Sequence, residues 1–390
     1  MFKRLTLVSV RCVAANLYIN LRRERRAQNN TSMPDADIRE RLGRYLDTPI
    51  ERAPVLASGW ETTVFEFSLA EPSVRFPEMP PGRSLVLRFY QGPIADQKAA
   101  RESRAIEQMY SIRFPVPRPY AFESEHDALG APFLIMERIA GGPLFSTRSF
   151  PEAIKRFSLG FLAFVRTQVK LHRIAPSRHE LRDLPRALQP SGVAPGTPLL
   201  DRALAVIAER VENGPLPGLK EALRRLTARA GAYRVADSSI VHMDYHPLNV
   251  LVEGKRVTGV IDWVNTDVGD RHLDAAMTAA ILSSSAMERP RWMRDNLIGN
   301  FLRGVFTTMY VPLYHAMARL DFERFRYCQA IAALLRLSML GMMKARGPET
   351  VGFRSEAISE VTPAVVRLLT RYAERKSGAS VRLDLAPVPV

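Results

Sequence analysis

Two aspartates and one asparagine within residues 241–263 have the types and spacing of a catalytic and metal-binding loop. The segment begins Val-His-Met-Asp-Tyr-His-Pro-Leu-Asn-Val-Leu-Val and ends Gly-Val-Ile-Asp-Trp. Asn249 follows Asp244 by five residues, and Asp262 follows Asn249 by thirteen. Carboxylate and amide oxygens are the hard ligands that Mg²⁺ prefers. The segment therefore predicts a loop that combines a carboxylate base with a magnesium site.

This order of side chains suits the transfer of a phosphoryl group, which needs an oriented hydroxyl and positioned metal ions more than covalent help. Asp244 would accept a hydrogen bond from an attacking hydroxyl and take its proton late. Asn249 and Asp262 would hold magnesium, and a hairpin between them would fix their separation. Protein kinases have the same order, with His-x-Asp, an asparagine at the same distance, and Asp-Phe-Gly.

The same run resembles the signature of the aminoglycoside phosphotransferase and choline kinase family. The similarity extends over about residues 50–345 and includes the Leu-His pair ending at His172 and the Gly-Asp pair ending at Asp270. It implies an α+β, bilobal protein-kinase-like fold and a small-molecule kinase that uses ATP and Mg²⁺ and has a small-molecule hydroxyl as acceptor. Met243 stands where glycine is common in the family, and Arg88 where many relatives have lysine.

A phosphate-covering loop is expected between the first two strands, where kinases place theirs. The segment 56–64 contains one glycine, Gly59, in place of the three of a typical glycine-rich loop. Ser58 and Thr62 would donate hydrogen bonds to phosphate oxygens. A plain hairpin turn is the alternative interpretation.

The resemblance also places the other nucleotide contacts. Arg88 occupies the position of the family's phosphate-pairing cation, with Glu102 on the following helix as its expected partner and Glu107 as the second candidate. The alternative is an exposed charge on a strand. Adenine is expected to contact backbone groups near Glu137 and Ile139.

Hydrophobic periodicity predicts a small β-rich part first. Apolar residues every fourth position predict a helix over Asp35–Leu46. Alternating and apolar runs then predict strands on both sides of one more helix. The strands are expected within 55–69, at 84–90, 120–123 and 133–136, and the helix at 94–110.

After Gly142, long helical patterns dominate the sequence. They cover 151–174, 199–213, 219–230 and several segments from 273 to 375, and strands interrupt them within 239–263. We therefore expect a basic, disordered extension over 1–34, a nucleotide-binding lobe over 35–140 and a helical lobe with the catalytic and metal-binding loops over 141–390. The glycines at 141 and 142 would form the hinge.

The net charge of +15 is uneven along the chain, because residues 1–32 alone contribute +6. Met33 begins a sequence that leads directly into the first predicted helix, so an over-called start codon would explain the residues before it. No basic stripe with interleaved aromatic residues appears, and nucleic-acid binding is not expected.

No uninterrupted stretch of about 18 apolar residues occurs, so no membrane contact is expected. The two cysteines, Cys12 and Cys328, are far apart and follow no metal-ligand spacing. This favours a reducing compartment, and a cytoplasmic location is the prediction.

Three other functions compete with a small-molecule kinase. The alternation of His242, Asp244 and His246 would also suit a metal cluster in a hydrolase. A nucleotide-binding regulator or pseudokinase with little turnover would typically lack the catalytic aspartate or a metal ligand. Here Asp244, Asn249 and Asp262 are all present. A protein kinase is disfavoured because no Ala-Pro-Glu element follows Asp262.

The acceptor itself is left open by the sequence. Asp267 lies near the second metal ligand, where relatives meet cationic acceptors, whereas Asp270 and Asp274 have the pattern of structural residues. A neutral sugar, a macrolide-like hydroxyl and a metabolite alcohol are equally compatible with the residues.

Overall fold

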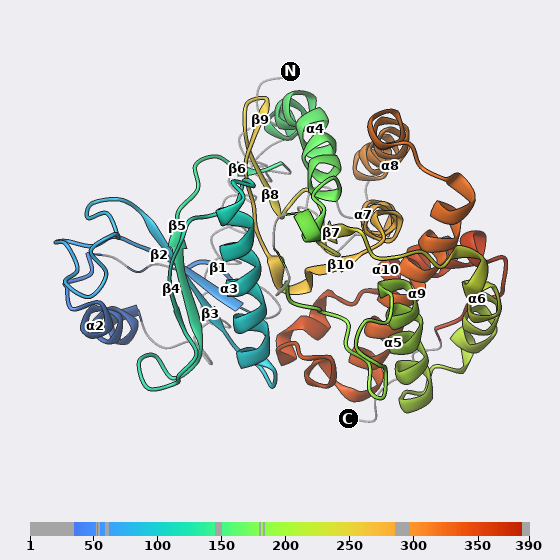
Figure 1. The fold of residues 1–390 in the computed structure, drawn as a ribbon, viewed down its shortest axis with the longest axis horizontal. Coiled ribbons are helices and arrows are strands. Elements are labelled where there is room, and N and C mark those ends of the chain that lie inside the picture. The colour runs from blue at the N-terminus through green and yellow to red at the C-terminus, as the bar shows by residue number, and fades with distance from the viewer. Residues whose placement is uncertain are drawn as a thin grey trace, which may run out of the picture.

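The computed structural model describes residues 35–383 except 52, 54, 59–61, 145–149, 179–180, 182–183 and 285–296. A five-stranded sheet lies on one side of the described part and a helical region on the other (Figure 1). This arrangement confirms the predicted α+β fold class. The expected basic extension over 1–34 lies outside the described residues.

The sheet is antiparallel throughout, with strand order β1-β2-β3-β5-β4. All six residues of the central strand β3 are buried. Because successive side chains alternate between the faces of a strand, Arg88 shares a face with Val86 and Tyr90. The strands are β1 (Val55–Ser58), β2 (Thr62–Phe67), β3 (Leu85–Tyr90), β4 (Pro119–Glu123) and β5 (Phe133–Glu137).

Each face of the sheet packs on a different helix. The predicted helix α2 (Asp35–Leu46) joins one hydrophobic cluster with Leu85 and Leu87. Val86 belongs to a second cluster, which includes α3 (Ala95–Ser111) and extends into the helical region. Helix α3 therefore lies between the sheet and the helices that follow (Figure 1).

Short strands link the two regions and carry the loop of interest. Gly142, one of the two glycines expected as a hinge, begins strand β6 (Gly142–Pro143), which pairs with β8. Strands β8 and β9 form the predicted hairpin, and Gly254 in its two-residue turn has a φ of 59°, which favours glycine. These strands are β7 (Ser239–Val241), β8 (Val250–Glu253), β9 (Arg256–Val260) and β10 (Asp267–Gly269), the last paired with β7.

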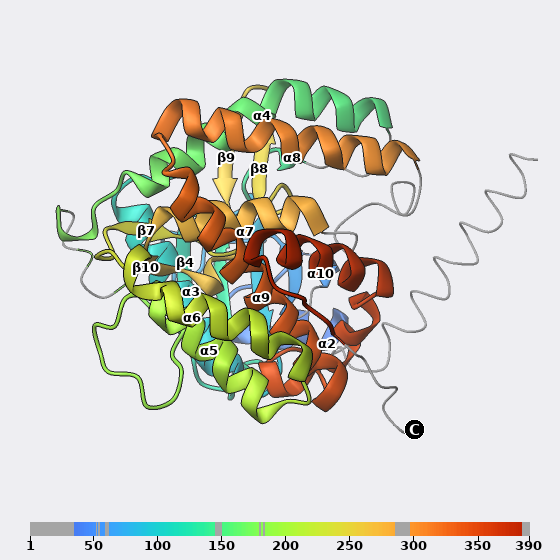
Figure 2. The same ribbon diagram turned by 90° about the vertical axis from the view of Figure 1, so that its right-hand side faces the viewer.

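The helical region packs around α9, which contacts α5, α6, α7 and α10. Helices α4 and α8 lie side by side (Figure 2). The helix ranges predicted individually agree with the structure within three residues at each end. The helices are α4 (Phe150–His172), α5 (Leu199–Asn213), α6 (Lys220–Tyr233), α7 (Arg271–Ser284), α8 (Leu297–Ala318), α9 (Phe322–Arg346) and α10 (Pro363–Ser377).

Short 3₁₀ segments connect these elements: η1 (Pro176–Arg178), η2 (Pro217–Leu219), η3 (Trp263–Asn265), η5 (Pro348–Val351) and η6 (Ser355–Glu360).

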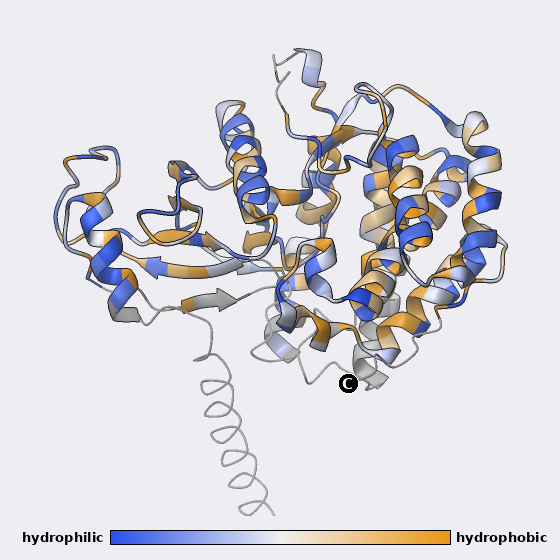
Figure 3. Cartoon of the chain, turned by 90° about the horizontal axis from the view of Figure 1, so that it is seen from below, coloured by the Kyte–Doolittle hydropathy of each residue, from blue (hydrophilic) through white to orange (hydrophobic). Residues whose placement is uncertain are grey.

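Helix α9 begins and ends with defined caps. The Asp321 carboxylate accepts hydrogen bonds from the backbone amides of Glu323 and Arg324, and Gly347 follows the last turn with a φ of 90°. The helix is long and apolar enough to cross a membrane, but 83% of its most apolar window is buried inside the structure. Figure 3 shows hydrophobic residues both on the helices of this region and on the strands of the sheet. We interpret α9 as the central core helix.

Candidate active site

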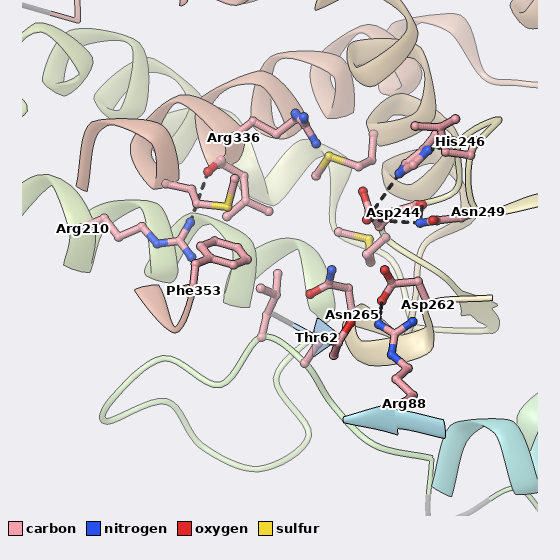
Figure 4. A pocket seen from close by; sticks show the side chains of 17 residues that line it. Thr62, Arg88, Arg210, Asp244, His246, Asn249, Asp262, Asn265, Arg336 and Phe353 are labelled. Carbon is pink, nitrogen blue, oxygen red and sulfur yellow. Dashed lines mark hydrogen bonds and ion pairs between the residues drawn. The ribbon is translucent and has the colours of Figure 1, made fainter. Parts of the chain in front are cut away.

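A pocket of about 320 Å³ lies where the sheet meets the helical region (Figure 4). It is lined by side chains from the strands, the catalytic loop and the helices. Five of the residues predicted to form the site line this pocket together: Thr62, Arg88, Asp244, Asn249 and Asp262.

Arg88 bridges two acids at the floor of the pocket. Its Nε lies 3.0 Å from Oε2 of Glu102, and its Nη2 donates to Oδ1 of Asp262 at 2.8 Å. The predicted pair with Glu102 is present, whereas Glu107 accepts a hydrogen bond from Ser103 instead. Only 9% of the Arg88 side chain is exposed, so the alternative of an exposed strand charge is wrong.

Glu102 ties helix α3 to the segment that carries Asp262. Its Oε2 accepts from the Tyr90 hydroxyl at 2.7 Å, and its Oε1 accepts from the backbone amide of Trp263 at 3.3 Å. Burial raises the pKa of Glu102 to about 7, against the attraction of Arg88, which lowers it. The guanidinium is thus the main group that opposes the effect of burial on this carboxylate.

His242 holds the catalytic loop to the loop of the second aspartate. Its Nδ1 accepts from the backbone amide of Asp244 at 3.3 Å, so its Nε2 carries the proton and donates to the carbonyl of Ile261 at 3.1 Å. Burial lowers the pKa of His242, which keeps the ring neutral. His242 therefore has a structural role in this loop.

Asp244 faces the pocket with 25% of its side chain exposed. The Nδ2 of Asn249 donates to its backbone carbonyl at 3.0 Å and to its Oδ2 at 3.4 Å, and Nε2 of His246 lies 3.6 Å from the same oxygen. Burial raises the pKa of Asp244, but the attraction of His246, Arg336 and His242 outweighs burial and lowers the pKa to about 2. The carboxylate is therefore ionised at neutral pH.

A buried polar network supports this loop from below. Asp274 accepts from the backbone amide of Met243 at 2.5 Å, from Nε2 of His172 at 2.7 Å and from Nε2 of Gln168 at 3.1 Å. The pKa of Asp274 is lowered because these bonds outweigh burial. His172 also contacts the Tyr314 hydroxyl at 2.6 Å, as a packed helix-end histidine would.

The acids that follow Asp262 in the sequence are engaged elsewhere. Asp267 forms two hydrogen bonds of 2.8 Å with the guanidinium of Arg202. Asp270 pairs with His272 and Arg324. Neither lines the pocket, so these carboxylates do not face an acceptor there.

Met243 adopts a backbone conformation that suits glycine, with a φ of 60°. A Cβ in the left-handed region costs roughly 1–2 kcal/mol, partly offset by the greater freedom of glycine in the unfolded chain. Because both changes remove the buried thioether, Met243→Gly is expected to be more stable than Met243→Ala by roughly 0.5–1 kcal/mol. Urea unfolding of the two variants measures this difference. Equal stability would mean that the loop carries no such strain.

Asn249 and Asp262 fit a magnesium ion by their chemistry. The Nδ2 of Asn249 is bound to Asp244, which leaves its amide oxygen for a cation, and 34% of the Asp262 side chain is exposed to the pocket. Within the described ranges, no group of three or more His, Cys, Asp or Glu side chains could hold a metal. Phosphate oxygens and water would complete such a site, and the hydrolase cluster at residues 242–246 is not supported.

The structure gives no test of the predicted contacts from Ser58 and Gly59, and Glu137 and Ile139 do not line the pocket. Ser58 ends β1 and its side chain lies outside the described residues, as does all of Gly59. Glu137 and Ile139 lie beyond the pocket near the β5–β6 connection, where Ile139 packs closely on Gly259. Their roles in holding a nucleotide stay predictions.

Other residues line the pocket without having been predicted from the sequence. Arg210, Asn265, Arg336 and Phe353 reach it from α5, η3, α9 and the segment after η5 (Figure 4). The one signal available for Arg336 was its position as the single charged residue between Arg326 and Lys344.

The sequence of the chain also matches a protein-family model. Residues 53–320, about two thirds of the chain, match the model of the phosphotransferase enzyme family. The chain belongs to this family. The matched part contains the whole pocket floor and the catalytic loop, but ends before Arg336 and Phe353.

The chain is also similar to part of a longer curated protein. Acyl-CoA dehydrogenase family member 11 of Gallus gallus is 25% identical over 243 residues, which are 60% of this chain and 30% of that protein. The chain thus corresponds to less than a third of this curated relative.

Solved structures share the fold. An aminoglycoside phosphotransferase structure from Ralstonia eutropha has a TM-score of 0.58 at 17% identity, covering 86% of this chain and 98% of that one. Aminoglycoside phosphotransferase APH(4)-Ia has a TM-score of 0.56 at 16% identity, covering 88% and 99%. These likenesses confirm the expected protein-kinase-like fold.

Proposed function

We propose that the chain is an ATP-dependent small-molecule kinase that transfers the γ-phosphate to a hydroxyl group. The observation that carries this proposal is the meeting of Asp244, Asn249 and Asp262 with the Arg88–Glu102 pair in one pocket of a phosphotransferase-family chain. APH(4)-Ia has been solved in ternary complex with AMP-PNP and hygromycin B, which supports nucleotide and small-molecule binding by this fold.

In the proposed reaction the acceptor hydroxyl lies against the carboxylate of Asp244. Its oxygen forms a bond to the γ-phosphorus while the bond from that phosphorus to the β–γ bridging oxygen breaks. ADP leaves with that electron pair, and the hydroxyl proton passes to Asp244. Because Asn249 and His246 both lie on the Oδ2 side of Asp244, Oδ1 is the oxygen that has no hydrogen-bond partner within the described residues.

In the proposed nucleotide site, residues of the loop hold the metal ion and residues of the sheet contact the phosphate groups. Asn249 and Asp262 would hold magnesium, which when bound neutralises charge on the phosphate oxygens. Arg88 would contact phosphate from β3, held in place by Glu102. Thr62 would add a hydroxyl donor from β2.

The domain division at residues 140 and 141, a cytoplasmic location and the absence of nucleic-acid and membrane partners are also proposals. The domain division is supported by the pairing of β6, just after the boundary, with β8, and the absence of a membrane partner by the burial of α9. The location and the absence of nucleic-acid binding rest on the sequence. A regulator or pseudokinase remains the competing function, and the complete set of catalytic and metal-binding residues argues against it.

The proposed function is tested by a coupled assay of ADP formation with Mg–ATP. Alcohols, sugars, aminoglycosides and macrolides are supplied one at a time, with a reaction lacking acceptor as the control. We expect at least one acceptor to stimulate ADP formation, with the phosphorylated product seen by mass spectrometry. Tight Mg–ATP binding without stimulation by any acceptor would favour the regulator instead.

Arg88→Ala is expected to raise the KM for ATP by roughly 10- to 100-fold, the usual effect of losing charged hydrogen bonds. Arg88→Lys should keep part of the activity, because an ammonium keeps the charge but not the planar fork. Arg234, paired with Asp201 on the surface, offers a control in Arg234→Ala. If both Arg88 variants bind ATP as the parent does, the phosphate-binding cation is another residue.

A further inference from the structure

Arg336 is a buried cation in the wall of the pocket. It lies in the middle of α9 and is the only charged residue between Arg326 and Lys344. It is only 9% exposed, and it lines the pocket. Its guanidinium makes no hydrogen bond or ion pair with any residue that the structure describes, and its Nε is buried without a partner.

A buried guanidinium without a partner lowers the stability of the fold unless a ligand binds to it. Buried polar groups are nearly always hydrogen-bonded, and a buried charge without a partner destabilises a fold. In Figure 4 the guanidinium extends toward the side of the pocket where Asp244 and His246 lie. It contributes to the low pKa of Asp244 without pairing with it. The space beside Asp244 therefore faces a cation with unused donors.

Arg210 adds a second positive charge to the same wall. It reaches the pocket from α5 and donates to the carbonyl of Leu335, the neighbour of Arg336, at 3.1 Å. Burial lowers its pKa to about 10, so it is still charged at neutral pH, and it has no ion pair within the described ranges. Of the acids lining the pocket, Asp262 is paired with Arg88.

Apolar side chains also line the pocket. Met277, Leu335, Met339 and Phe353 line it together with Leu188. A molecule that fills this side would thus place a hydrophobic part against methionine and phenylalanine side chains. A cationic acceptor would meet two arginines and no available carboxylate except the base itself.

We propose that the phosphate acceptor is an anionic alcohol, whose carboxylate or phosphate group binds Arg336 while its hydroxyl lies at Asp244. Its apolar part would pack against Met339 and Phe353. This inference rests on the proposed kinase function and names the substrate class of that same site.

The position of Arg336 indicates that its ligand is the acceptor and not the nucleotide. Arg88 and Thr62, the proposed nucleotide contacts, come from the sheet, whereas Arg336 comes from the helical region on the other side of Asp244 (Figure 4). It also lies outside residues 53–320, the part shared with the family model. A residue that selects the acceptor of this particular chain is expected to lie outside the part that the whole family shares.

The proposal is tested with four alcohols that differ only in one terminal group. They are 6-hydroxyhexanoate, 6-hydroxyhexyl phosphate, the neutral 6-hydroxyhexanamide and the cationic 6-amino-1-hexanol. We expect kcat/KM for at least one anion to exceed that for the amide by about tenfold or more, as charged hydrogen bonds allow. The preferred anion then distinguishes a carboxylate from a phosphate acceptor. A preference for the amide or the ammonium would overturn the proposal.

Arg336→Gln should reduce the anion-to-amide ratio of kcat/KM to near one without changing the KM for ATP. Arg336→Lys should restore part of the preference, since the charge is kept. Arg346→Gln, at an exposed position of the same helix, is the matched control and should leave the ratio unchanged. A merely structural role for Arg336 would lower kcat/KM for both alcohols equally, and a role in nucleotide binding would raise the KM for ATP. Either result would overturn the proposal.

Calorimetry of 6-hydroxyhexanoate and 6-hydroxyhexyl phosphate binding in the presence of Mg–ADP tests the anion site separately from the kinase function. Binding that depends on Arg336 without any ADP-forming activity would refute the kinase function and keep the anion site. Turnover of neutral or cationic alcohols without anion binding would keep the kinase function and refute the anion site. Absence of both anion binding and anion turnover would also overturn the site.

Discussion

Asp244→Asn is expected to lower turnover by a factor on the order of 10²–10⁴, the usual contribution of a positioned general base. The substitution preserves the shape of the side chain, so the loop held by His242 and Asn249 should not change. It removes the negative charge that would accept the hydroxyl proton. Because the nucleotide contacts are expected from Arg88 and Asp262, the affinity for Mg–ATP should stay close to that of the parent.

Calorimetry of Mg–ATP binding and a coupled ADP assay on parent and variant measure the two quantities separately. Hydrolysis of ATP without acceptor should fall less, because water has several ways to approach the phosphate. A variant that keeps turnover close to the parental rate would show that Asp244 is not the base. Loss of nucleotide affinity in step with turnover would instead assign Asp244 to the nucleotide site.

Local sequence patterns predicted most of the fold because each element obeys a short-range rule. The four-residue spacing of Ile38, Leu42 and Leu46 gave helix α2 with its observed bounds. The hairpin around Gly254 followed from a turn residue between two apolar runs. In both cases the residues that decide the structure lie within one element.

The meeting of Asp244, Asn249 and Asp262 in one pocket was also predictable, since they are close in sequence. Their meeting with Arg88 was predicted only through the family resemblance, because 174 residues separate Arg88 from Asp262. Nothing local indicates that Arg88 on strand β3 contacts the residue that follows the hairpin by two positions. Tertiary packing of α3 between the sheet and the helices creates the contact.

The acceptor wall could not be predicted for the same reason. Arg210 and Arg336 lie on different helices, and only the packing of α5 against α9 brings them to one pocket. Asp267 was considered as an acceptor contact because of its position in sequence. The structure shows that its partner is Arg202, which no spacing rule connects to it. The positions of charged residues in the sequence therefore did not predict which charged side chains line the pocket.

Asp262→Asn is expected to lower turnover by on the order of 10²–10³ or more, because a metal ion contributes several kcal/mol to such reactions. The change replaces a charged oxygen ligand by a neutral amide. ATP binding should lose most of its dependence on magnesium, in contrast to Asp244→Asn. Titrations of ATP with magnesium and with chelator, on parent and variant, measure this dependence.

The same substitution also breaks the 2.8 Å ion pair between Asp262 and Arg88, so loss of a salt bridge must be separated from loss of a metal ligand. Asp201→Asn offers the matched control, because Asp201 pairs with Arg234 at 2.7 Å and lies outside the pocket. If magnesium binds the parent at Asp262, only Asp262→Asn changes the magnesium dependence. Nucleotide binding that is independent of magnesium in the parent itself would remove Asp262 as a metal ligand, and its carboxylate would then serve to orient Arg88.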